Sequence, residues 1–243
     1  MPSEVEDSPP SIESFRSEKW LTNQPLIEEL LASVRKILQV DDQVRLSDLH
    51  TTQDLVPQKD WRNFRAGRTL YAKRYHSAIN KKSEEIHDFS LLYQKLVRDS
   101  CASEVGLTKG CGEVLLYQKW PTFRVVYPGR GRPEGKIHKD ADYFHQIGEI
   151  NFWIPFVDLR DHSSACLYAE SEPGRGDFHT FNCALGEFVR FWGNQVTHYT
   201  VENDSDITRV SMDFRVIRLC DFKEESGKGN RFKRHEYYNE IVV

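Results

Sequence analysis

The change in sequence pattern near residue 112 constrains the fold more than any other feature. From there to residue 217 the chain consists of short runs rich in β-branched and aromatic residues, which Gly, Pro, Asn and Asp separate. The runs are EVLLYQKW, TFRVVYP, EINFWIPFV, ACLYAES, DFHTF, GEFVRFW, THYTV and TRVSMDFRVI. Successive short strands without intervening helices are typical of β-sandwiches and β-barrels rather than of βαβ units. We therefore predict a mainly β core.

Helical patterns precede this region. Apolar residues recur at helical spacing over 25–38, where Pro25 opens the helix, and again over 83–103, where Ser83 is the predicted N-cap. The stretch between them is only weakly helical in pattern. The predicted division is a flexible lead-in at 1–24 and a single domain at 25–243. That domain consists of a helical brace (25–110), a β core (111–220) and a charged C-terminal tail (221–243).

Composition excludes several classes of protein. The 243 residues carry 33 Lys and Arg against 37 Asp and Glu, and this net charge of −4 argues against nucleic acid as a partner. No apolar run approaches the roughly 18 residues that a membrane-spanning helix needs, and the N-terminus lacks the order of a signal peptide. The 5 cysteines form no CxxC pair, so neither a disulfide framework nor a zinc-cysteine site is expected. We expect a cytoplasmic protein without a membrane partner.

The segment His138-Lys139-Asp140 is the first candidate for chemistry. In an extended segment, side chains at i and i+2 leave on the same face, so His138 and Asp140 can converge on one metal ion. His198, at the edge of a predicted strand, is the candidate third ligand. Two imidazoles and one carboxylate leave coordination positions open, which suits Fe(II) that takes a co-substrate and O₂. Asp142 has the same strand parity as Asp140 and is the alternative carboxylate ligand. We favour Asp140, because one intervening residue holds the two ligands closer together, and Asp142 could instead orient a ligand imidazole.

Arg209 follows His198 by eleven residues and opens the last predicted strand. If it points inward, its planar guanidinium suits a bidentate pair with a carboxylate. Thr200 and Ser211 share the face parity of His198 and Arg209 respectively, and their hydroxyls could complete a carboxylate site. The alternative is a surface Arg209 paired with Asp213.

Taken in this order, His138-x-Asp140, His198 and Arg209 resemble the Fe(II)/2-oxoglutarate-dependent dioxygenases. The interval from His198 to Arg209 is similar to that of the phytanoyl-hydroxylase branch. HKDADYFHQIGEINFWIPF, ESEPGRGDFHTF and TRVSMDFRV resemble the streptomycin-biosynthesis type, and the kainoid-cyclising oxygenases of red algae belong to the same neighbourhood. The resemblance covers roughly residues 112–218.

The resemblance implies a double-stranded β-helix core, the jelly-roll or cupin-like fold, braced by α-helices. It also implies that His138, Asp140 and His198 hold Fe(II), and that Arg209 binds the distal carboxylate of 2-oxoglutarate with Thr200 or Ser211 assisting. O₂ is then the other co-substrate, and a small amino-acid-like molecule is the substrate. A kainoid synthase would cyclise an N-prenylated glutamate. Hydroxylation and desaturation stay open, as does a non-catalytic cupin-like metal or small-molecule binding protein.

Other positions in the β core are weaker candidates. Asn151 lies in an apolar strand, where burial without partners would cost free energy, so it either faces solvent or binds something, and we take it as a co-substrate contact. Gln118, Thr122 and Arg124 lie on the two strands before the metal motif and are candidate substrate contacts. Trp153 is a further candidate, with core packing as the alternative.

Overall fold

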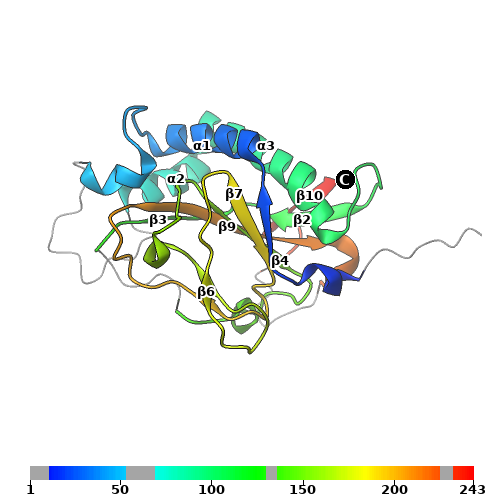
Figure 1. Ribbon diagram of the computed structural model, residues 1–243. Coiled ribbons are helices and arrows are strands. Elements are labelled where there is room, and N and C mark those ends of the chain that lie inside the picture. Colours follow the sequence, from blue (N-terminus) through cyan, green and yellow to red (C-terminus); the bar gives the residue numbers. More distant parts are fainter. Residues whose placement is uncertain (1–10, 53–68, 130–135, 225–231) are drawn as a thin grey trace, which may run out of the picture.

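The computed structural model describes residues 11–52, 69–129, 136–224 and 232–243, which form a layer of helices and two β-sheets (Figure 1). The α-helices are α1 (Gln24–Leu38), α2 (Leu70–Lys81) and α3 (Glu84–Leu96). The strands are β1 (Lys19–Thr22), β2 (Val114–Gln118), β3 (Thr122–Val126), β4 (Ile150–Pro155), β5 (Tyr168–Ala169), β6 (His179–Thr180), β7 (Glu187–Phe191), β8 (His198–Tyr199), β9 (Arg209–Arg218) and β10 (Tyr238–Val242).

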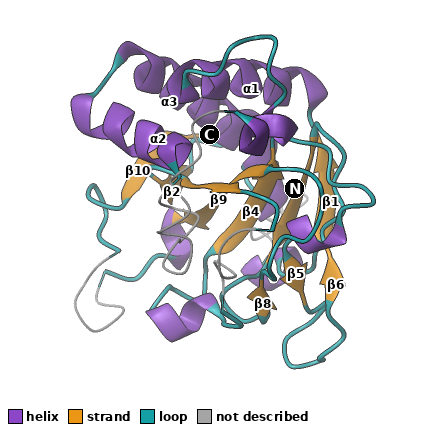
Figure 2. Ribbon diagram, turned by 90° about the vertical axis from the view of Figure 1, so that its left-hand side faces the viewer, coloured by secondary structure: helices purple, strands orange, loops and turns teal. Residues whose placement is uncertain are grey.

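The strands form a large and a small antiparallel sheet. The large sheet has the order β1-β7-β4-β9-β2-β10, with β3 also paired to β9, and the small sheet has the order β6-β5-β8. The long strand β9 pairs with β3 along its first half, with β2 along its second half, and with β4 on its other edge. Figure 2 shows the small sheet on the side of the large sheet that faces away from the helices. This is the mainly β, helix-braced architecture that the sequence predicts.

The two strongest helix predictions are confirmed. The side chain of Asn23 caps α1 by accepting from the Leu26 amide at 3.3 Å, and Ser83 caps α3 as predicted. The apolar faces of both helices enter the same core as the strands of the large sheet, and this core includes Leu30, Phe89 and Phe214. None of the helices described is long and apolar enough to cross a bilayer. Part of the weakly helical stretch forms α2, and residues 53–68 lie outside the described part of the chain.

Both ends of the predicted division need correction. Within the predicted lead-in 1–24, β1 pairs with β7 from Lys19↔Arg190 to Thr22↔Glu187, while residues 1–10 lie outside the described residues. Within the predicted tail, β10 pairs with β2 and closes the opposite edge of the large sheet. Both are short edge strands that form by backbone pairing with strands distant in the chain, so a local side-chain pattern carries little strand signal.

Candidate metal centre

His138 and His198 face each other across a pair of backbone hydrogen bonds. The His138 amide donates to the His198 carbonyl at 3.1 Å, and the His198 amide donates to the His138 carbonyl at 2.9 Å. On its other side, His198 is in register with Ala169 of β5. The imidazole centroids are 4.3 Å apart. The small sheet therefore aligns two histidines that lie sixty residues apart in the chain.

Asp140 reaches the same place from a different backbone conformation than predicted. It begins a 3-10 turn over Asp140–Tyr143, and its amide donates to the Gly193 carbonyl at 2.9 Å. Its carboxylate is buried, and Oδ1 lies 3.7 Å from Nε2 of His138 and 3.8 Å from Nε2 of His198. One ligand atom from each of the three residues lies within 4.8 Å of the others. The predicted convergence holds, although a turn and not an extended segment produces it.

Backbone carbonyls fix the orientation of both imidazoles. Nδ1 of His138 lies 2.6 Å from the Lys136 carbonyl, and Nδ1 of His198 lies 3.0 Å from the Val196 carbonyl. Because a carbonyl only accepts, each Nδ1 carries a proton, and a ring in its neutral form then presents the lone pair of Nε2 to the cluster. Burial lowers the pKa of His198 below its ordinary value, which favours this neutral form.

The carboxylate of Asp140 is held by two side chains. Nε of Arg215 donates to Oδ2 at 2.8 Å and a terminal nitrogen of Arg215 donates to Oδ1 at 2.9 Å, while Nδ2 of Asn151 donates to Oδ2 at 2.7 Å. Oδ2 thus accepts two donors, and Oδ1 accepts one and faces both Nε2 atoms with its remaining lone pair. Burial alone would raise the pKa of Asp140, but the charge and hydrogen bonds of Arg215 outweigh it and hold this pKa well below its ordinary value.

Asp142 does not orient a ligand imidazole, a role that the sequence left open for it. Its carboxylate is exposed, and Oδ2 accepts from the Lys139 amide at 3.0 Å, which closes the turn over Asp140–Tyr143. Among the described residues, no imidazole is hydrogen-bonded to it. Asp142 therefore shapes the backbone beside the cluster and does not orient a ligand ring.

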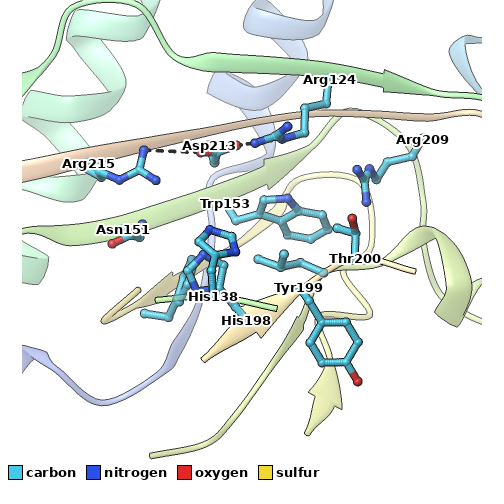
Figure 3. A pocket seen from close by; sticks show the side chains of 12 residues that line it. Arg124, His138, Asn151, Trp153, His198, Tyr199, Thr200, Arg209, Asp213 and Arg215 are labelled. Carbon is cyan, nitrogen blue, oxygen red and sulfur yellow. Dashed lines mark hydrogen bonds and ion pairs between the residues drawn. The ribbon is translucent and has the colours of Figure 1, made fainter. Parts of the chain in front are cut away.

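The cluster opens into a pocket with an empty volume of about 470 Å³, part of which is continuous with solvent (Figure 3). The pocket is lined by Arg124, His138, Asn151, Trp153, Leu167, Phe191, His198, Tyr199, Thr200, Arg209, Asp213 and Arg215. The predicted residues Arg124, Trp153, Thr200 and Arg209 are thus brought together with the cluster. Figure 3 shows the guanidinium of Arg209 above Thr200, at the end of the pocket opposite Asn151.

Arg209 is buried, and not the surface residue of the alternative interpretation. It is 2% exposed, and its guanidinium donates to the Ala165 carbonyl at 3.1 Å. Asp213 instead lies 3.4 Å from Arg124 and 3.6 Å from Arg215. Arg209 therefore presents a buried cation to one end of the pocket.

Three predicted contacts lie outside the pocket lining. Oε1 of Gln118 accepts from Arg215 at 3.2 Å, and its amide nitrogen donates to the Trp120 carbonyl at 2.8 Å and to Thr122 at 3.4 Å. Gln118 thus supports Arg215, and Thr122 supports Gln118. Ser211 is 1% exposed and also does not line the pocket. Asn151 does line the pocket, but its amide is hydrogen-bonded to Asp140.

Arg215 and Gly193 were not anticipated as residues of the site, and neither were the lining residues Leu167, Phe191 and Tyr199. Arg215 lies on the same face of β9 as Arg209, so strand parity within TRVSMDFR could have indicated a second inward guanidinium. No feature of the sequence indicated a role for Gly193. A Cβ at this position would lie 2.6 Å from Nδ2 of Asn151, so the absence of a side chain makes room for the amide that holds Asp140.

Fold and site together define a jelly-roll protein with a cluster of two histidines and one carboxylate. The solved structure of EctD from S. alaskensis in its apoform superposes with a TM-score of 0.54 at 13% identity, covering 94% of this chain and 84% of that chain. The same protein with 2-oxoglutarate and 5-hydroxyectoine superposes with a TM-score of 0.51 at 13% identity, covering 94% and 85%. These likenesses confirm the predicted jelly-roll fold.

The sequence itself is similar to one curated protein from an antibiotic producer. The streptomycin biosynthesis protein StrG of Streptomyces griseus is 27% identical over 177 residues, which cover 71% of this chain and 77% of StrG. No protein-family model matches the chain.

Proposed function

We propose that this protein is an Fe(II)- and 2-oxoglutarate-dependent oxygenase that acts on a small molecule. The observation that carries the proposal is the convergence of His138, Asp140 and His198 within 4.8 Å, in a pocket that also presents Arg209. Two neutral Nε2 atoms and one carboxylate oxygen fit a divalent iron ion and leave positions for a chelating co-substrate and O₂. The 2-oxoglutarate-bound neighbour with the same fold supports this choice of co-substrate.

The roles of the side chains follow from their positions. An Fe(II) ion bound by the three ligands supplies the redox chemistry that consumes 2-oxoglutarate and O₂ and oxidises a substrate C–H bond. Arg209 binds the distal carboxylate of 2-oxoglutarate, and the Thr200 hydroxyl beside it adds a hydrogen bond. Asn151 and Arg215 hold the Asp140 carboxylate in place. The apolar walls, including Leu167 and Phe191, limit the access of water to the reacting centre.

Within this class we propose an amino-acid-like substrate, and the first reaction to test is cyclisation of an N-prenylated glutamate to a kainoid. The motif resemblance supports it, and so does Arg124, whose partly exposed guanidinium on the pocket wall suits a substrate carboxylate. Hydroxylation of another natural-product intermediate is the second candidate, and the similarity to a streptomycin biosynthesis protein favours it. Product mass separates the two, because hydroxylation adds one oxygen and cyclisation removes two hydrogens.

The deciding experiment is an anaerobic incubation with Fe(II) and 2-oxoglutarate, followed by O₂ and a panel of amino-acid and antibiotic-intermediate substrates. We expect substrate-dependent succinate formation, which His198→Ala abolishes. The matched control is His179→Ala, because His179 bonds to Glu18 and lies outside the pocket lining. If no substrate stimulates succinate formation, the small-molecule oxygenase is contradicted. If the protein binds metal without any turnover, the non-catalytic cupin-like alternative is favoured.

A further inference from the structure

A second buried polar cluster lies next to Arg215 but outside the pocket lining. It consists of His145, Glu149 and Tyr238, of which Glu149 and Tyr238 are fully buried. These residues come from the loop after the Asp140–Tyr143 turn, from the position directly before β4 and from the C-terminal strand β10. The cluster therefore joins the C-terminal strand to the loop that carries Asp140.

The carboxylate of Glu149 is the centre of this cluster. Its Oε1 accepts from the Tyr238 hydroxyl at 2.5 Å and from the Gln146 amide at 3.1 Å, and its Oε2 lies 2.7 Å from Nδ1 of His145. The ring of Phe232 stacks on His145 with centroids 3.9 Å apart. A carboxylate removed from water is stable only with such donors and a nearby cation, so the position of Glu149 is closely defined.

Arg215 lies between this carboxylate and that of Asp140. Its Nε is 2.8 Å from Oδ2 of Asp140 and 3.8 Å from Oε2 of Glu149. One guanidinium thus faces two buried carboxylates as well as the half-buried carboxylate of Asp213 at 3.6 Å, and these charges together set where it lies. The strand β10 also affects the position of Arg215 through Gln118. Tyr238 is in register with Gln118, and the Gln118 side chain accepts a hydrogen bond from Arg215.

We propose that the C-terminal strand positions the carboxylate that binds the metal. Tyr238 fixes Glu149, Glu149 and Gln118 fix Arg215, and Arg215 presents Oδ1 of Asp140 to the ion. Tyr238 and Glu149 are positioning residues and touch neither ion nor substrate. The proposal rests on the proposed metal centre. Removing the charge of Glu149 takes away one of the carboxylates that attract Arg215, so its pair with Asp140 becomes tighter and competes with the ion for the same carboxylate.

The test is a Co(II) titration of the full-length protein and its variants, followed by the visible absorption of the bound ion, with the melting temperature measured on the same samples. Tyr238→Phe removes only the hydroxyl that contacts Glu149, whereas Glu149→Gln removes the charge and replaces one acceptor oxygen with an NH₂ donor. We expect each to raise the Co(II) dissociation constant by roughly three- to tenfold, at or below the lower end of the loss for a direct partner of a metal ligand, because each acts through Arg215. Tyr75→Phe is the matched control, since the Tyr75 hydroxyl is also buried and donates to a backbone carbonyl outside the cluster, that of Pro121 at 3.2 Å, and this variant should bind Co(II) like the wild type.

The outcomes separate positioning from simple stabilisation. A lower melting temperature with an unchanged Co(II) dissociation constant in Tyr238→Phe would overturn the proposal, because that is the result of a purely structural role. If Glu149→Gln does not fold, Tyr238→Phe decides alone. If the wild-type protein binds no Co(II), the metal centre itself is contradicted, which distinguishes failure of the proposed function from failure of this inference.

Discussion

Arg215 donates two hydrogen bonds, of 2.8 and 2.9 Å, to the carboxylate of Asp140, although the two residues lie 75 positions apart in the chain. Both residues are buried, at 8% and 2% exposed. The pair connects β9 of the large sheet to the turn over Asp140–Tyr143. Just before that turn, His138 forms the bridge to His198 of the small sheet. The candidate metal centre is therefore a junction between the two sheets of the fold.

Removing the cation from this pair is expected to destabilise the protein strongly. Arg215→Met should lower the free energy of unfolding by about 3–5 kcal/mol, because it leaves a buried carboxylate without its charge partner. Urea unfolding at pH 7 measures the change. Arg160→Met is the control. Arg160 pairs with Asp158 on the surface, and because the two side chains are 65% and 44% exposed, water can solvate both groups and the free energy of unfolding should hardly change. Equal losses in the two variants would contradict the prediction.

A methyl group at Gly193 is expected to disturb Asn151. The added Cβ would lie 2.6 Å from Nδ2 of Asn151, so Gly193→Ala should displace the amide from Asp140 and cost about 1–3 kcal/mol of stability. A double-mutant cycle tests the cause. In an Asn151→Ala background the nearest clashing atoms are gone, and Gly193→Ala should then cost much less. The same cost in both backgrounds would show that Asn151 is not the source of the effect.

Arg209 is expected to control the use of 2-oxoglutarate. Loss of a charge-assisted contact worth about 1.5–3 kcal/mol predicts that Arg209→Met raises the KM for 2-oxoglutarate by roughly tenfold or more. Initial rates of succinate formation against 2-oxoglutarate concentration measure it. Arg190→Met removes another buried guanidinium, one that bonds to Glu104 and Ser17 outside the pocket. That variant should be less stable but should keep the wild-type KM, and a shift of the same size there would speak against the assignment of Arg209.

Glu170 is expected to give the protein a pH-dependent part of its stability. Its carboxylate accepts from the amides of Gly174, Gly176 and Thr197 at 3.0–3.1 Å, which ties the loop after β5 to the segment before His198. Burial alone would raise the pKa of Glu170, but the hydrogen bonds, chiefly from Thr197, outweigh it and lower this pKa below its ordinary value of 4.5. Because the folded-state pKa is the lower one, the stabilisation is present above about pH 4.5 and is lost as the pH falls through the folded-state value.

The variant Glu170→Gln tests this direction of the pH dependence of stability. Either orientation of the glutamine amide turns its NH₂ group toward a backbone N–H, so we expect a loss of about 1 kcal/mol at pH 7. Urea unfolding at decreasing pH should show the gap between variant and wild type closing once Glu170 is protonated. A gap that stays constant down to about pH 3 would mean that the charge of Glu170 has no part in it.

The sequence predicts the fold well where the signals are local. The β core, the helices at 25–38 and 83–103 and the cap at Ser83 follow from residue types and periodicity within short windows. Residue types and periodicity did not predict the edge strands β1 and β10, since these strands form only by pairing with strands far away in the chain. The same distinction applies to the site: strand parity was enough to place His198 and Arg209, but not the turn that carries Asp140.

The sequence by itself determined which chemical groups are available, namely two imidazoles, a carboxylate and a guanidinium at the spacings of a metal and co-substrate site. Only the tertiary structure decided how they are held. It selected Asp140 over Asp142, committed Asn151 and Gln118 to supporting contacts, and brought Arg215 to the metal side of the large sheet. The physical reason is that a buried carboxylate needs donors on its other lone pairs, and in this fold those donors come from strands that are distant in the chain and meet only when the two sheets pack.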